Sequence, residues 1–69
     1  MNPDERIRIG SRIRELRQKR GLSIYELADM TGLQFQNVSR IELGKYSTGI
    51  DILSKIAAAL KCTIDFVEQ

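Results

Sequence analysis

Residues 23–43 read SIYELADMTGLQFQNVSRIEL, two short amphipathic segments on either side of one glycine. Ser23 is followed three residues later by Glu26, the spacing of a capping box, in which the hydroxyl and the carboxylate satisfy free N–H groups at the start of a helix. Gly32 can supply the positive φ that ends such a helix. The stretch therefore predicts a helix, a sharp turn and a second helix over residues 34–42.

The flanking sequence predicts three more helices and no strand. Asn2 fits an N-cap and Pro3 the first position of a helix that runs until Gly21. A helix is expected from about residue 50 to residue 60, and Thr63 is expected to cap a last short helix. That last helix would carry Ile64, Phe66 and Val67. The fold class is accordingly all-α, with five helices in a single domain over residues 1–69.

The amino-acid composition indicates the cellular compartment and argues against a membrane partner. Cys62 is the one cysteine, so no disulfide can form within the chain, and we expect a reducing, cytoplasmic location. The first residues, MNPDERIRIG, are charged where a signal peptide would be apolar, and no apolar run reaches the roughly 20 residues that span a bilayer. We therefore expect a soluble protein without a membrane partner.

Charge is distributed unevenly along the chain. Residues 1–22 contain seven basic and three acidic residues, a net charge of +4, whereas residues 23–69 contain four basic and six acidic residues, a net charge of −2. Such asymmetry is typical of a protein with one face toward a polyanion. An arginine-rich helix that is simply solvated would give the same count.

Helical geometry assigns the side chains of the predicted helix 34–42 to faces. Val38 and Ile41 define the side toward the core, and Gln36, Ser39 and Arg40 lie opposite them. Glutamine can bond adenine with two hydrogen bonds, and arginine can do the same with guanine. In an isolated helix these would be ordinary solvated residues, but the helix-turn-helix pattern around them favours base reading.

Five segments together resemble the Cro and phage-repressor type of helix-turn-helix domain, the Xre family. They are IRELRQKRGLS at 13–23, ELA at 26–28, TGL at 31–33, VSRIELGK at 38–45 and LSKIAAAL at 53–60. The order and spacing of these segments carry the resemblance, which extends from about Ile9 to Val67. It implies a compact five-helix domain of the lambda-repressor type that inserts helix 34–42 into the major groove of DNA.

The resemblance also implies roles for individual residues. Its base-reading positions correspond to Phe35, Gln36 and Arg40. Its phosphate contacts correspond to the start of the second helix and to Asn37, Ser39, Lys45 and Tyr46. A structural salt bridge between the first and third helices corresponds to Arg17 and Glu42. Helical angle independently turns Glu42 toward the core and places Arg17 one turn from Ile13 on the same flank.

Three positions depart from the family pattern. Ile24 and Phe35 are apolar where relatives often carry a polar pair, so either the two pack together and extend the core, or Phe35 touches a thymine methyl group. In both cases adenine readout from position 35 is absent. Gln34 stands where a serine or threonine cap is usual, so the start of the third helix is expected to be poorly capped.

The leading hypothesis is a sequence-specific DNA-binding transcriptional regulator, expected to be a repressor that binds a two-fold related operator as a homodimer. The predicted dimer surface comprises Ile52, Ile56, Phe66 and Val67. The alternatives use the same fold with a protein partner, as an antitoxin with its toxin or as an interaction module without DNA.

An enzyme is not expected. The chain has no histidine, no glycine-rich phosphate loop and no metal-ligand spacing, and Cys62 lies among apolar neighbours, as a structural thiol does. The sequence accordingly predicts no catalytic residue, no metal and no cofactor.

Overall fold

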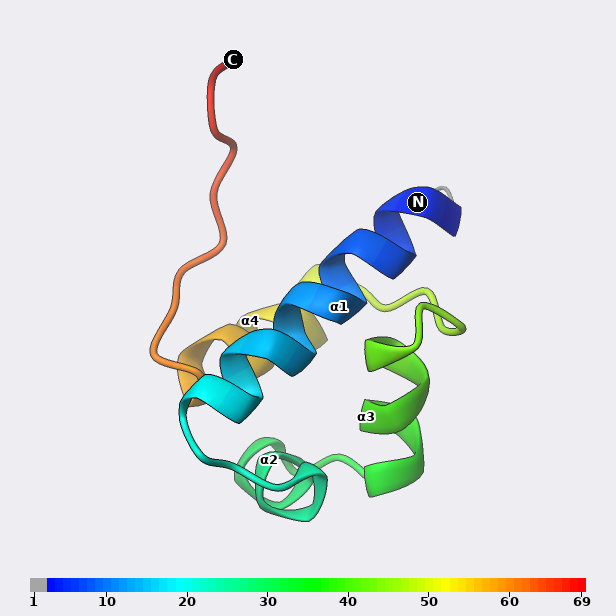
Figure 1. Cartoon of the computed structure of the whole chain (residues 1–69), viewed down its shortest axis with the longest axis vertical. Helices are drawn as coiled ribbons and strands as arrows, with labels where there is room; N and C mark the ends of the chain where they lie inside the picture. Colours follow the sequence, from blue (N-terminus) through cyan, green and yellow to red (C-terminus); the bar gives the residue numbers. More distant parts are fainter. Residues whose placement is uncertain (1–2) are drawn as a thin grey trace.

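This computed structural model describes residues 3–69, which contain four α-helices (Figure 1). They are α1 (Pro3–Lys19), α2 (Ile24–Thr31), α3 (Phe35–Glu42) and α4 (Ile50–Ala59). The described residues contain no strand, so the all-α prediction is confirmed. The predicted cap at Asn2 lies outside the described residues, and the assignment of residues 1–69 to one domain stays a prediction.

The core lies where all four helices meet. Leu27 of α2 and Val38 of α3 have no exposed surface, and Ile56 and Leu60 are only 1% exposed. The remaining buried apolar residues are Ile13, Ala28 and Ile41. Burial of this kind, rather than intrinsic helix propensity, is what holds two eight-residue helices such as α2 and α3 in place.

All four helices end in the same backbone arrangement. A residue with positive φ follows each helix, and the N–H group of the next residue bonds a carbonyl in the last turn, as in a Schellman motif. These bonds join Leu22 to Arg17, Leu33 to Ala28, Lys45 to Arg40 and Cys62 to Ala57. Glycine supplies the positive φ after α1, α2 and α3, whereas Lys61, at φ 59°, supplies it after α4.

The backbones of α1 and α3 approach each other at Gly10. A Cβ atom at this position would lie 2.3 Å from the carbonyl oxygen of Ile41 and 2.7 Å from that of Glu42. Gly44 makes a second close approach, because its Cβ would lie 2.8 Å from the Cα atom of Ile7, and its φ is +73°. Two glycines thus let α3 and the turn after it lie directly against α1.

The prediction of a fifth helix is wrong. Residues 62–69 carry no regular secondary structure and extend away from the helices, as the orange-to-red segment of Figure 1 shows. Phe66 and Val67 are 102% and 83% exposed, so they contribute no burial that could offset the cost of starting a short helix. We call residues 62–69 the tail.

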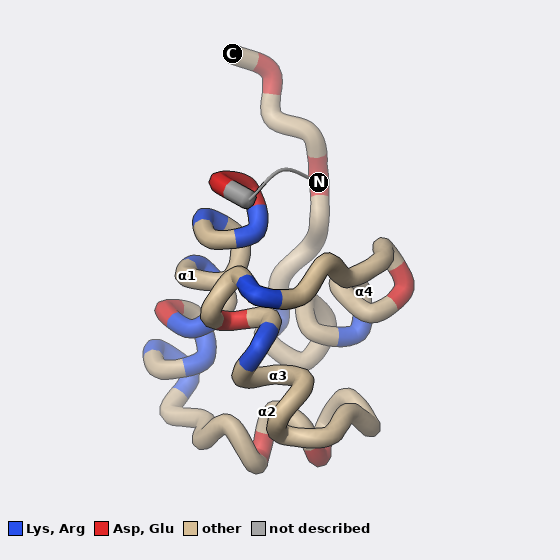
Figure 2. The backbone as a smooth tube through the Cα atoms, turned by 90° about the vertical axis from the view of Figure 1, so that its right-hand side faces the viewer, with Lys and Arg blue, Asp and Glu red and all other residues tan. Residues whose placement is uncertain are grey.

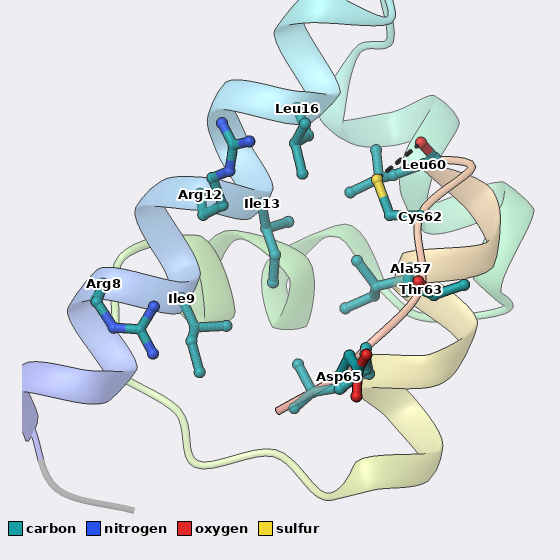
Figure 3. Close-up of a pocket in the computed structure, with 13 residues that line it drawn as sticks. Arg8, Ile9, Arg12, Ile13, Leu16, Ala57, Leu60, Cys62, Thr63 and Asp65 are labelled. Carbon is teal, nitrogen blue, oxygen red and sulfur yellow. Dashed lines mark hydrogen bonds between the residues drawn. The ribbon is translucent and has the colours of Figure 1, made fainter. Parts of the chain in front are cut away.

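The predicted dimer surface is also corrected at one position. Ile56 belongs to the core and is closed to a partner, and Ile52 packs partly against the same core. Phe66 and Val67 remain accessible. The start of the tail borders an apolar groove of about 270 Å³ between α1 and α4, with Arg8 and Arg12 on the α1 side and Asp65 on the tail (Figure 3).

Candidate nucleic-acid interface

The exposed face of α3 carries two of the predicted base-reading residues. Gln36 and Arg40 are exposed, while Val38, Ile41 and Glu42 are buried on the opposite side. Gln36 and Arg40 are four residues apart, one turn of helix, so they share a face. Within the described residues neither side chain makes a hydrogen bond or ion pair inside the chain. Both are available to an external partner.

A buried ion pair fixes the back of α3 to α1. The Arg17 Nε and Nη2 atoms donate to the two Glu42 carboxylate oxygens at 2.7 and 3.1 Å, and Nη1 donates to the Leu22 carbonyl at 2.8 Å. The two side chains are 12% and 5% exposed. The hydrogen bonds that Arg17 donates to the Glu42 carboxylate raise the pKa of Arg17. The guanidinium therefore joins α1, the turn before α2 and the last turn of α3.

The start of α2 is fixed by the capping box that the sequence predicted. Ser23 Oγ accepts from the Glu26 N–H at 3.1 Å, and Glu26 Oε1 accepts from the Ser23 N–H at 2.9 Å. The hydrogen bond that the Ser23 N–H donates to the charged carboxylate is the main cause that lowers the pKa of Glu26. By contrast, Gln34 makes no side-chain cap at the start of α3, as its residue type predicted.

An aromatic pair connects the starts of the two helices. The rings of Tyr25 and Phe35 have centroids 4.8 Å apart and planes inclined at 49°. Such pairs contribute about 0.5–1.5 kcal/mol beyond the area that they bury. Phe35 nevertheless stays 40% exposed and Tyr25 63% exposed, so Phe35 does not join the core. Ile24, in contrast, packs against the core.

A shallow groove of about 430 Å³ lies beside this pair, between α1, the start of α2 and α3. Its lining includes Arg14, Ser23, Tyr25, Ser39 and Leu43. Neither Arg14 nor Tyr25 is among the residues that the sequence predicts for this site. Arg14 was recognisable because it lies three residues before Arg17 and therefore on the same face of α1. The ring contact of Tyr25 crosses a turn and has no local signal.

The loop after α3 adds a cation next to Arg40. The Lys45 N–H donates to the Arg40 carbonyl at 2.9 Å, which holds the two residues at the same end of α3. Lys45 and Tyr46 are exposed, whereas Asn37 and Ser39 are half-buried. Figure 2 shows lysine and arginine gathered along α1 and at the end of α3 with the following loop. This arrangement places positive charge beside an exposed polar helix face.

Further features of residues 3–69 bear on function: metal-binding groups, the Cys62 thiol and the apolar length of the helices. The described residues contain no group of three or more histidine, cysteine or acidic residues that could hold a metal ion. The Cys62 thiol donates to the Leu60 carbonyl at 3.3 Å, a contact that holds the turn after α4. None of the helices described is long and apolar enough to cross a membrane.

Comparisons with known proteins consistently find similarity to helix-turn-helix proteins. The Helix-turn-helix family model HTH_3 matches residues 13–67. An HTH-type transcriptional regulatory protein of Pyrococcus furiosus is 43% identical over 47 residues, which are 68% of this chain and 15% of that protein. The HTH-type transcriptional regulator PuuR of Escherichia coli is 40% identical over 53 residues, 77% of this chain and 29% of that protein. The chain thus spans less than a third of the length of either relative.

A solved structure of similar size also matches. The restriction-modification controller protein C.AhdI from Aeromonas hydrophila superposes with a TM-score of 0.84 at 33% identity, over 87% of this chain and 91% of that chain. The four-helix arrangement described above is therefore shared with a protein of nearly the same length.

Proposed function

The chain belongs to the Xre and Cro-type helix-turn-helix family, and from that premise we propose that it is a sequence-specific DNA-binding transcriptional regulator. The observation that carries the proposal is the exposed face of α3, where Gln36 and Arg40 have no partner among residues 3–69. In a helix-turn-helix protein the second helix lies in the major groove with its first residues at the base edges. Phe35, Gln36 and Arg40 are the residues that we propose read bases.

Phosphate contacts would surround this face. Lys45 and Tyr46 lie in the loop next to Arg40, Asn37 and Ser39 lie on α3, and Arg14 lies across the groove from Ser39. Each phosphate that a lysine or arginine neutralises releases counterions and makes affinity fall with salt. Arg17 is not in this set, because its guanidinium is occupied by Glu42 and the Leu22 carbonyl.

We propose further that the regulator is a homodimer and acts as a repressor. One α3 helix reads few base pairs, so useful specificity needs two half-sites about one helical turn apart. The exposed Phe66 and Val67, with the partly buried Ile52, form the surface that we assign to the second copy. Because its partner is DNA, we place the protein in the cytoplasm.

An alternative function is supported by the same tail. Exposed apolar residues in an extended segment also suit a different protein partner, such as the toxin of a toxin–antitoxin pair or another regulator. As an antitoxin the chain would bind its toxin through the tail and keep the DNA binding of α3. As an interaction module without DNA it would show no preference among DNA sequences, so a DNA-binding assay separates the module from the regulator, and binding of a toxin separates the antitoxin.

The test is selection of bound sequences from a random duplex library, followed by gel-shift assays. We expect enrichment of one two-fold related sequence and loss of its binding in the variants Gln36→Ala and Arg40→Ala. Gln18→Ala on α1 and Lys55→Ala on α4 are the matched controls, because both residues are exposed outside the candidate interface. No enrichment, or equal loss in the controls, would refute the proposal.

A further inference from the structure

The Tyr25–Phe35 ring pair is an apolar surface among the polar and cationic residues of the candidate interface. Phe35 is the first residue of α3, directly before Gln36, and Tyr25 lines the same groove as Arg14 and Ser39. The pair is therefore continuous with the face that we assign to DNA. An apolar patch rimmed by polar residues is typical of a binding surface.

The chemistry of Phe35 limits what it can recognise. A phenyl ring has no hydrogen-bond donor or acceptor, so it cannot read the polar atoms of a base edge. The one apolar group that distinguishes base pairs in the major groove is the methyl group on C5 of thymine. 5-Methylcytosine presents the same methyl group at the same position, whereas cytosine does not.

We infer that Phe35 contacts the C5-methyl group of a pyrimidine in each half-site, thymine or 5-methylcytosine, and that Tyr25 is the positioning residue that orients its ring. This inference rests on the proposed function and adds the identity of one recognised group. It makes the protein sensitive to cytosine methylation at one position of its binding site.

The structure explains why Phe35 needs such a support. Gln34 provides no side-chain cap, so the start of α3 has no polar side-chain anchor of the kind that Ser23 gives α2. The Tyr25 ring, with its centroid 4.8 Å away, packs against the Phe35 ring, and 40% of the Phe35 surface stays exposed. A phenylalanine held on one side and open on the other can accept a methyl group without rearrangement.

The direct experiment changes the methyl group and nothing else. In the selected two-fold related duplex, each thymine of one half-site is replaced in turn by deoxyuridine, which pairs identically but lacks the methyl group. We expect one position at which binding weakens about fourfold, the fold-change for losing the burial of one methyl group. At that position 5-methylcytosine should bind more tightly than cytosine by about the same factor.

Protein variants then assign the effect to the ring pair. Phe35→Ala should bind the thymine and deoxyuridine duplexes equally, and Tyr25→Ala should reduce their ratio, while Tyr25→Phe should preserve it. Met30→Ala is the control, an exposed apolar residue of α2 outside the ring pair. Melting temperatures identify any variant that fails to fold, in which case Phe35→Leu, which keeps an apolar side chain, replaces Phe35→Ala.

The outcomes separate this inference from the proposed function. If the wild-type chain binds no duplex with sequence preference, the proposed function fails. If it binds with preference but no deoxyuridine substitution weakens binding, the inference alone is overturned. A thymine–deoxyuridine ratio that survives Phe35→Ala would also overturn it.

Discussion

Similar residues adopt opposite structures in the helix-turn-helix and in the tail. Ser23 and Thr63 each precede a short stretch with apolar residues, and both are residue types that begin helices. After Ser23 the chain forms α2 with a complete capping box, whereas after Thr63 it stays extended. Leu27 is fully buried, while Phe66 is fully exposed.

Two physical differences account for this contrast. Glu26 lies three residues after Ser23 and completes the capping box, but the residue three after Thr63 is Phe66, which cannot accept a hydrogen bond. Moreover, α2 buries apolar residues against its neighbours, whereas most of the tail has nothing to pack against. A cap-like residue therefore predicts a helix only where burial follows it.

The largest effect is expected for Glu42→Ala, which removes one partner of the ion pair behind α3. Arg17 would be left buried without its carboxylate, a change that typically costs about 3–5 kcal/mol. Urea denaturation measures it. Glu15→Ala is the control, since the Arg12–Glu15 pair is solvent-exposed and such pairs are worth about 1 kcal/mol or less. Equal losses in the two variants would show that the Arg17–Glu42 pair does not anchor α3.

The contrast between the helix-turn-helix and the tail is tested most simply by replacing one large apolar side chain with alanine in each region. Leu27→Ala should lower the free energy of unfolding by about 2–5 kcal/mol, because it opens a cavity in the core. Phe66→Ala should leave the stability of the monomer almost unchanged and weaken self-association, measured by sedimentation. A large loss of monomer stability from Phe66→Ala would mean that the tail packs on the helices in solution.

Gly10→Ala should lower the free energy of unfolding. Overpacking typically costs about 1–3 kcal/mol, and we expect a loss near the upper end of that range because backbone carbonyl groups block the new Cβ atom. Alanine gains about 1 kcal/mol in helix propensity over glycine, which acts in the opposite direction. Thermal denaturation measures the loss, and Ser11→Ala, an exposed substitution on the same helix, is the control. A stabilised Gly10→Ala variant would contradict the close approach of α1 to α3.

The smallest effect concerns the capping box and pH. The pKa of Glu26 is lower in the folded than in the unfolded chain, so its contribution to stability is present above the unfolded pKa and is lost as pH falls through the folded pKa. Glu26→Gln should therefore lose less stability on acidification than the wild type. The residual acid dependence would include Glu5, whose pKa is lowered by its hydrogen bond from Arg8. Identical acid dependence in variant and wild type would contradict this role.

The sequence was sufficient wherever the determining interaction is local. The capping box, the three glycines with positive φ and the alternation of buried and exposed residues on α3 follow from residue type and spacing. The close approach at Gly10 and the Tyr25–Phe35 contact join segments that meet only after folding. Lys61 adopts a positive φ that favours glycine, so its residue type gave no signal for the end of α4.

The central claim is that the exposed face of α3 reads bases while the residues around it bind phosphates. The most direct measurement is the dissociation constant for the selected duplex and for a scrambled duplex over a range of salt concentrations. Gln36→Ala should lower the ratio of the two constants and leave the salt dependence unchanged, whereas Lys45→Ala should preserve the ratio and reduce the slope by about one. A wild-type slope near zero, or the same response in both variants, would contradict the account.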